Sequence, residues 1–160
     1  MTLDEWNALD AAAAERELRR VCAAPRWARQ VVASRPHPDL ASLQATAEVA
    51  LSDADLDEAM AGHPRIGDRT ADGASRREQS GVAGADPEVL AALAEGNRAY
   101  EERFGHVYLV CATGRSAQEL LDVLRARLGN DPATERAVAL AELAAINRLR
   151  IARLVGEEPA

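Results

Sequence analysis

The chain has 160 residues, of which 48% are hydrophobic and 28% are charged. This length and composition suit one folded domain with a buried core and exclude an intrinsically disordered chain. Aromatic residues make up only 3% of the chain. Ala, Leu, Val and Ile must therefore build most of the core, which favours helices over β-sheets.

All 19 basic residues are arginines. The absence of lysine excludes Schiff-base and pyridoxal-phosphate chemistry and a P-loop. The net charge of -7 argues against a nucleic-acid partner or an anionic membrane, because a basic face supplies most of the affinity for both. We also expect no membrane span, since no apolar run approaches the ~20 residues that one needs.

The two cysteines, Cys22 and Cys111, are too few for a four-cysteine zinc site, and the chain has no Cys-x-x-Cys pair. A metal site built from His63, Asp68 and His106 would lack a recognised ligand spacing, so we expect no metal. The first ten residues are acidic and unlike a signal peptide. We therefore expect a reduced, cytoplasmic protein.

Capping residues, prolines in first turns and glycines after last turns divide the chain into helices. We predict helices from Thr2 or Asp4 to Leu9, Asp10 to about Ala24, Arg26 to Ser34, Asp39 to about Leu51, Ser52 to Gly62, Ser75 to Gly81, Asp86 to Arg103 and Ser116 to Leu128, and a final helix of about 24 residues from Asp131. In the helix from Asp86, the spacing of Leu90, Leu93, Asn97 and Tyr100 predicts a face that points into the core.

Two stretches break this helical pattern. The stretch from Gly62 to Ser75 holds three glycines and Pro64, which predicts a loop. Residues 107–112 form a six-residue apolar run, either a short buried strand, which would have no sheet to join, or an extended segment. We predict an all-α fold: a single-domain compact bundle of about eight helices over residues 1–160, with one short extended segment.

The first group of candidate functional residues is His63-Pro64-Arg65-Ile66-Gly67-Asp68. Histidine can give or take a proton near neutral pH, and the proline stiffens the backbone after it. The alternative is a helix-terminal histidine that interacts only with free carbonyls.

The second group is Ser75-Arg76-Arg77-Glu78-Gln79. On a helix, Ser75, Glu78 and Gln79 share one face. Ser75 and Glu78 also fit a capping box, which would explain them without any ligand. Gln79 is not required by a capping box.

The third group is the stretch from Phe104 to Ala112. Backbone amide and carbonyl groups in a buried, extended segment need partners, and a flat heterocyclic ligand would supply them. The alternative is packing against loop backbone. Within this stretch, Cys111 lies in apolar surroundings and is expected to be inert, and His106 is predicted to be an exposed loop residue.

The remaining histidine and the arginines of the last helix are expected mainly on the surface. His37, between two prolines, is expected on the surface. Arg148, Arg150 and Arg153 in the last helix are expected on a solvated face, although one of them could turn inward.

The order and spacing of these groups resemble one family. His-Pro-Arg-Ile-Gly at 63–67, Ser-x-x-Glu-Gln at 75–79, Asn-x-x-Tyr-x-x-x-Phe-Gly at 97–105 and Tyr-Leu-Val-Cys-Ala at 108–112 resemble the 2-oxo-4-hydroxy-4-carboxy-5-ureidoimidazoline (OHCU) decarboxylases. Further similar landmarks are Pro25-Arg26-Trp27, Arg35-Pro36, residues 127–130 and residues 146–151. The resemblance therefore covers essentially the whole chain.

The resemblance implies an all-helical, homodimeric carboxy-lyase of urate degradation that uses no cofactor and forms (S)-allantoin. It implies that His63 is catalytic with Glu78 as its partner. The substrate contacts that it implies are Pro64, Ser75, Gln79, Tyr108, Leu109, Val110, Cys111, Ala112 and one inward-facing arginine, which alignment of residues 146–150 places at Arg150.

Two other classes of function are kept as alternatives. One is a non-catalytic helical binding or regulatory module that uses a similar pocket. The other is a helical DNA-binding protein, which the net charge and the lack of a basic recognition helix disfavour.

Overall fold

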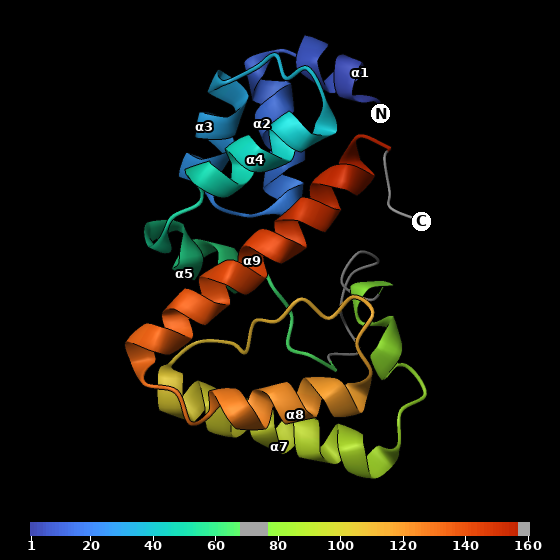
Figure 1. The fold of residues 1–160 in the computed structure, drawn as a ribbon, viewed down its shortest axis with the longest axis vertical. Helices are drawn as coiled ribbons and strands as arrows, with labels where there is room; N and C mark the ends of the chain where they lie inside the picture. The colour runs from blue at the N-terminus through green and yellow to red at the C-terminus, as the bar shows by residue number, and fades with distance from the viewer. Residues whose placement is uncertain (68–76, 157–160) are drawn as a thin grey trace. The chain divides into compact units, whose positions relative to one another are not determined.

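The computed structural model describes residues 1–67 and 77–156. In these ranges the chain forms eight α-helices, one 3-10 helix and no strand, so the predicted all-α class is confirmed (Figure 1). The elements are α1 (Leu3–Ala8), α2 (Ala11–Val21), α3 (Pro25–Ala33), α4 (Leu40–Ala50), α5 (Asp53–Ala61), η1 (Ser80–Val82), α7 (Pro87–Phe104), α8 (Ala117–Arg127) and α9 (Pro132–Leu154).

The helices begin where the capping residues predict. Thr2 and Ser116 each form a full capping box, with Glu5 and Glu119 as the third helical residue. Asp10 and Asp39 accept hydrogen bonds from the first-turn amides of α2 and α4. These local side-chain bonds satisfy amides that a helix start leaves without partners.

One predicted boundary is wrong, and another lies partly outside the described residues. α2 ends at Val21 rather than near Ala24: Cys22 is already extended, at φ -147° and ψ 124°. Pro25, which opens α3, also keeps Ala24 out of a helical conformation. The helix predicted from Ser75 to Gly81 starts outside the described residues; within them Glu78 is helical and η1 follows.

The chain divides into two compact units. The first unit comprises Met1–Gly62 and Leu143–Ala160, and the second comprises His63–Glu142. The first unit thus holds α1 to α5 and the end of α9, and the second holds η1, α7, α8 and the start of α9. The single domain expected over residues 1–160 stays a prediction.

In the first unit, side chains of α3 bind both α4 and α5. Trp27 is fully buried and its indole Nε1 donates a hydrogen bond to the Ala47 carbonyl at 2.8 Å. Arg26 pairs with the buried Asp55 and also donates to the Ala50 carbonyl. Arg26 and Trp27 of the Pro25-Arg26-Trp27 landmark therefore join α3 to α4 and α5.

His37 is buried, so its predicted place on the surface is wrong. Only 5% of the residue is exposed, its ring stacks near Trp6 with the centroids 6.1 Å apart, and its backbone exchanges hydrogen bonds with the Asn7 side chain at 2.9 and 3.1 Å. Asn7 lies 30 residues away in the chain. Burial lowers the pKa of the His37 imidazole below its ordinary value.

The lowered pKa of His37 predicts acid sensitivity of folding. The unfolded chain binds a proton at His37 below about pH 6.5, whereas the folded chain binds it only at lower pH. This contribution to stability is therefore complete above that pH and is lost as the pH falls toward the folded-state pKa. Urea unfolding at pH 7 and pH 5 should show a smaller pH-dependent loss in His37→Asn than in the parent. An equal loss in both proteins would contradict this prediction.

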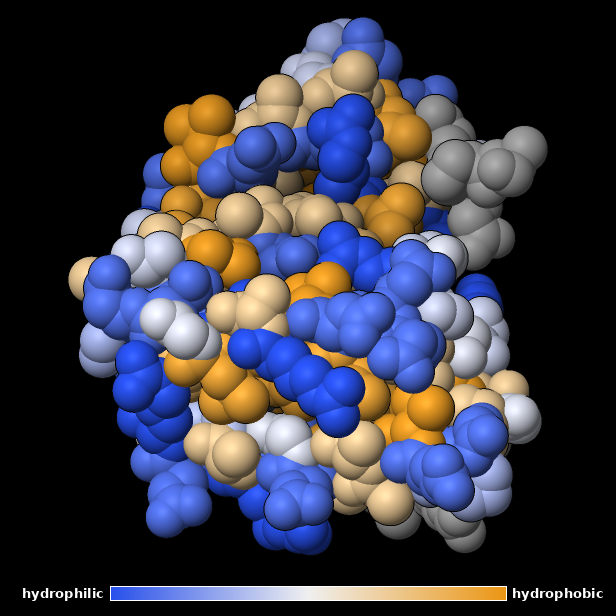
Figure 2. Space-filling model, turned by 60° about the horizontal axis from the view of Figure 1, so that its bottom comes forward, coloured by the Kyte–Doolittle hydropathy of each residue, from blue (hydrophilic) through white to orange (hydrophobic). Residues whose placement is uncertain are grey.

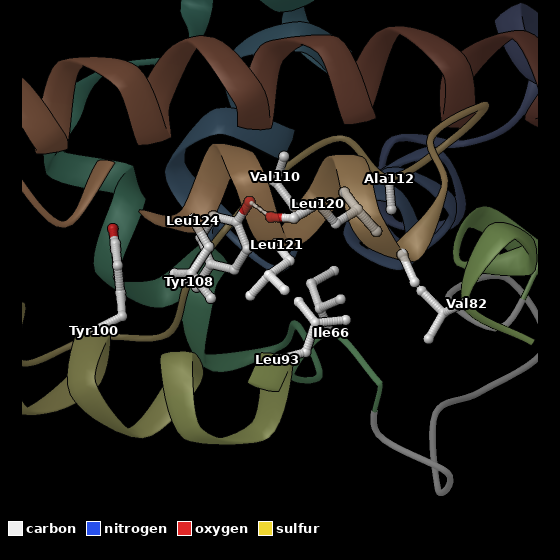
Figure 3. Close-up of a cluster of buried hydrophobic side chains, with 11 residues drawn as sticks. Ile66, Val82, Leu93, Tyr100, Tyr108, Val110, Ala112, Leu120, Leu121 and Leu124 are labelled. Atoms are coloured by element: carbon white, nitrogen blue, oxygen red, sulfur yellow. Dashed lines mark hydrogen bonds between the residues drawn. The ribbon is translucent and has the colours of Figure 1, made fainter. Parts of the chain in front are cut away.

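In the second unit, α7 and α8 pack side by side (Figure 1). Gly96 permits the close approach, because a Cβ there would lie 2.5 Å from the Leu124 Cδ2 atom. The loop after His63 and the 107–112 segment both place side chains in the core between these helices. Figure 3 shows this cluster, which consists of Ile66, Val82, Leu93, Tyr100, Tyr108, Val110, Ala112, Ala117, Leu120, Leu121 and Leu124.

The surface mixes hydrophilic and apolar side chains, as Figure 2 shows for one face. Among the described residues, the large hydrophobic side chains with high exposure are Met1 and Val49. Within the same residues, no helix is long and apolar enough to cross a membrane.

Candidate active site

His63 begins a short loop whose course is fixed by its neighbours. His63 and Pro64 are half-buried, and the Ile66 side chain that follows is buried in the core with Leu93. Gly67 turns the chain with φ +87°, a conformation that favours glycine. The predicted loop is thus confirmed over residues 63–67, and residues 68–76 lie outside the described part.

Gln79 ties the Glu78 segment to this loop. Its Oε1 accepts a hydrogen bond from the Gly67 amide at 2.8 Å, and its Nε2 donates to the Arg65 carbonyl at 3.4 Å. Glu78, which precedes it, is 8% exposed. Two of the sequence-predicted groups, at 63–67 and 75–79, are therefore joined directly.

The same segment also lies against the end of the extended stretch. A Cβ at Gly81 would lie 2.0 Å from the Arg115 carbonyl oxygen, so glycine is needed there. The Glu78 carboxylate is one of the charges that act on the Cys111 thiol. The third group, at 104–112, is thus brought close to the second.

Residues 107–112 are extended but form no strand, so the strand alternative is wrong. Charged side chains from helices bind the backbone of this segment: Arg127 Nη1 donates to the Leu109 carbonyl at 2.7 Å, and the Cys111 amide donates to Glu142 Oε2 at 3.2 Å. The Tyr108 hydroxyl donates to the Leu120 carbonyl at 3.0 Å (Figure 3). These bonds fix the segment without a sheet.

His106, at the start of this stretch, is half-buried rather than exposed as predicted. Its ring lies edge-on to the Tyr100 ring with the centroids 5.5 Å apart, and it stacks near Phe104. Both aromatic partners come from the last turns of α7. The histidine therefore covers the end of an aromatic cluster.

Arg127 belongs to a buried ion pair with Glu135. Arg127 is 5% exposed and Glu135 is fully buried. Glu135 also accepts hydrogen bonds from the Tyr100 hydroxyl and from the Asn130 amide. Burial alone would raise the pKa of the Glu135 carboxyl, but the hydrogen bonds from Arg127, Tyr100 and Asn130 outweigh it and hold the pKa below its ordinary value.

Cys111 is not an activated nucleophile. Burial foremost, and then the carboxylates of Glu142 and Glu78, raise the pKa of its thiol. A thiol rather than a thiolate is therefore present near neutral pH. This agrees with the expectation that Cys111 is chemically inert.

Two predicted site residues remain, Ser75 and Arg150. Ser75 lies outside the described residues. Arg150 belongs to the first unit, where it is half-buried and its Nη1 donates to the Val21 carbonyl at 3.0 Å. The convergence of His63 and Glu78 on one cavity, and the approach of Arg150 to it, stay predictions.

A hollow of about 470 Å³ lies beside the loop. It is lined by Arg65, Ile66 and Gly67 and by α7 residues between Ala94 and Glu101. None of the described residues that the resemblance marks as site residues line it. Within residues 1–67 and 77–156, no three His, Cys, Asp or Glu side chains are grouped so that they could hold a metal ion.

Comparisons with known proteins agree on one family. The family model described as OHCU decarboxylase matches residues 7–152. The chain is 28% identical over 155 residues to the uric acid degradation bifunctional protein TTL of Arabidopsis thaliana, covering 90% of this chain and 48% of that protein. It is 35% identical over 86 residues to the 2-oxo-4-hydroxy-4-carboxy-5-ureidoimidazoline decarboxylase of Amia calva, covering 54% of this chain and 49% of that protein. The chain thus spans about half the length of these two relatives.

Solved structures give the same result. A crystal structure of OHCU decarboxylase in the presence of (S)-allantoin is similar with a TM-score of 0.77 and 30% identity, covering 88% of this chain and 97% of that one. A crystal structure of (S)-allantoin synthase is similar with a TM-score of 0.74 at 16% identity, covering 97% of this chain and 54% of that one, and bears on the fold alone.

Proposed function

The chain belongs to the OHCU decarboxylase family, and we propose that it is a carboxy-lyase that converts 2-oxo-4-hydroxy-4-carboxy-5-ureidoimidazoline to (S)-allantoin without a cofactor. The observation that carries this proposal is the family match over residues 7–152. It is supported by the likeness, at 30% identity, to an OHCU decarboxylase crystallised in the presence of (S)-allantoin.

The chemistry needs an electron sink and a proton. When the bond from the ring carbon to the carboxylate breaks and carbon dioxide leaves, its electron pair moves into the neighbouring C=N and C=O groups of the ring. The neighbouring ring carbon, which bears the ureido group, then receives a proton on one face. The hydroxyl group on the carbon that lost the carboxylate gives up its proton and becomes a carbonyl, so that a single enantiomer of allantoin results. The protein has to hold the carboxylate out of the ring plane, stabilise the charge on the ring and deliver that proton.

We assign these tasks to the residues that the family resemblance marks. His63 donates the proton, since histidine is the side chain best suited to give or take a proton near neutral pH. Glu78 orients His63 or binds a donor group of the substrate, and Arg150 binds an anionic or carbonyl group through its planar guanidinium. Pro64, Ser75, Gln79 and the backbone from Tyr108 to Ala112 complete the contacts with the ring and its ureido group.

Two structural features support this division of tasks. The 108–112 backbone is fixed by Arg127 and Glu142, so its other polar groups can be presented to a ligand without reorganising. Among the described residues, Gln79 uses one N–H donor and one oxygen lone pair to bind the loop after His63. A side-chain amide has two N–H donors and two lone pairs. The second donor and lone pair are assigned to the substrate's ureido group.

We further propose that the protein acts in the cytoplasm as a homodimer. Cys22 and Cys111 are both free thiols, which fits a reducing compartment, and the dimer follows the family resemblance. Light scattering should give twice the chain mass of 17.1 kDa. A mass of one chain at micromolar concentration would contradict the dimer.

The activity is tested with freshly generated substrate. We expect the protein to accelerate the loss of the substrate's ultraviolet absorbance and to yield optically active (S)-allantoin, measured by circular dichroism. Decay at the spontaneous rate with a racemic product would contradict the proposed enzyme. Saturable binding without acceleration would favour the binding or regulatory module instead.

A further inference from the structure

Three consecutive residues after His63-Pro64 are held by side chains from elsewhere in the second unit. The Arg65 carbonyl and the Gly67 amide are bound by Gln79. The Ile66 carbonyl between them accepts a hydrogen bond from the Asn97 Nδ2 atom at 3.0 Å. Two side-chain amides therefore fix the backbone of this loop.

Asn97, the second of these two amides, lies on one face of α7. Leu93, Asn97 and Glu101 follow one another at intervals of four residues and so lie on one side of the helix. Leu93 packs with the Ile66 side chain in the core, Asn97 binds the Ile66 carbonyl, and Glu101 pairs with Arg65 at 3.0 Å. The loop after His63 thus lies along this face of α7.

The anchors differ in how much they can contribute. The Arg65 and Glu101 side chains are 63% and 26% exposed, and such surface pairs contribute about 0–1 kcal/mol. Asn97 is only 4% exposed, and its bond to Ile66 is shielded from water. The Asn97 bond is therefore the anchor that water cannot readily replace.

Asn97 is an unfavourable residue for packing alone. Its Oδ1 atom is buried and makes no hydrogen bond within the described residues, and a buried neutral polar group without a partner is costly. A leucine at this inward position, like Leu93 one turn earlier, would avoid that cost. The hydrogen bond from Asn97 Nδ2 to the Ile66 carbonyl thus explains this residue better than any contribution to core packing.

We propose that Asn97 is a positioning residue that sets the place of His63 relative to Glu78. This inference rests on the proposed function. Asn97 fixes Ile66, three residues after His63, and Gln79 fixes the same loop to the residue next to Glu78. A shift of the loop would move the imidazole that delivers the proton without touching the 108–112 backbone, which Arg127 and Glu142 hold separately.

The test is the kinetics of Asn97→Ala. Misplacement of a reacting group by about 1 Å can lower a rate by about 100-fold, so we expect kcat to fall by about 10- to 100-fold. KM should change by less than about threefold, because the lost interaction acts in the transition state. Alanine is also the best helix former, so α7 itself is not weakened.

Two matched variants on the same face of α7 separate positioning from loss of stability. Glu101→Ala removes the exposed anchor and should keep the parent kcat. Leu93→Ala removes core packing, which lowers stability, but keeps the Ile66 bond. It should keep the parent kcat per folded molecule, with the folded fraction measured by circular dichroism at the assay temperature.

The outcomes are distinguishable. A parent protein that does not accelerate substrate loss contradicts the proposed function itself. With an active parent, the inference is overturned if folded Asn97→Ala keeps the parent kcat, or if Leu93→Ala loses kcat per folded molecule equally. Should Asn97→Ala not fold at the assay temperature, the same comparison is made with Asn97→Ser at a temperature where it does.

Discussion

His63→Asn is expected to lower kcat for the loss of substrate absorbance by about 10²–10⁴-fold, the range for removing a general acid or base. Asparagine is close to histidine in size and polarity but cannot transfer a proton near neutral pH. The residual reaction should lose its stereochemical control, because no group delivers the proton to one face. Initial rates measure the first effect, and circular dichroism of the allantoin formed measures the second.

His37→Asn is the matched control for this experiment. It makes the same change of side chain, but in the first unit, where His37 is buried against Trp6. It should keep the parent kcat at pH 7, where the imidazole of the parent is neutral. Formation of one enantiomer at the parent rate by His63→Asn would show that another group donates the proton.

The helix starts could be predicted because their causes are local. Thr2, Asp10, Asp39 and Ser116 bond to amides within the next three residues. A short window of sequence therefore contains both partners of each capping bond.

The end of α2 was harder to predict. Arg19 and Arg20 fit the last turn of a helix, but no glycine follows them, and helix propensity alone would extend α2 toward Ala24. Pro25 excludes a helical Ala24, but the observed end at Val21 comes earlier, because Cys22 is already extended.

The burial of His37 and the course of residues 107–112 could not be predicted in this way, because their partners are distant in the chain. Asn7 lies 30 residues from His37. Arg127 and Glu142 lie 18 and 31 residues from the backbone groups of the extended segment that they bind. No local pattern indicates such pairs, so both a strand and an extended segment remained open.

For the candidate site, the motifs predicted the residue groups but not the connections between them. Gln79 stood out because a capping box does not need it, and its bonds to the loop after His63 now account for it. Glu135 was missed, although it had a signal: it lies four residues before the buried Ala139 and eight before the buried Leu143. A carboxylate on the inward face of a helix requires a buried partner.

Glu135→Ala is expected to lower the free energy of unfolding by about 3–5 kcal/mol, because it leaves the Arg127 guanidinium buried without its partner. The Tyr100 hydroxyl and the Asn130 amide lose an acceptor as well. Urea unfolding measures the change. Glu17→Ala is the control, since its pair with Arg20 is exposed and should contribute about 0–1 kcal/mol.

The double variant Arg127→Met with Glu135→Leu separates stability from the organisation of the extended segment. Apolar side chains of similar size can replace a buried ion pair at little cost, so much of the lost stability should return. The Leu109 carbonyl would lose its hydrogen bond from Arg127, and we therefore expect a raised KM in the stable double variant. If the double variant has the KM of the parent, the pair serves stability alone. If Glu135→Ala lowers the free energy of unfolding by less than about 1 kcal/mol, the buried Arg127 guanidinium finds another partner.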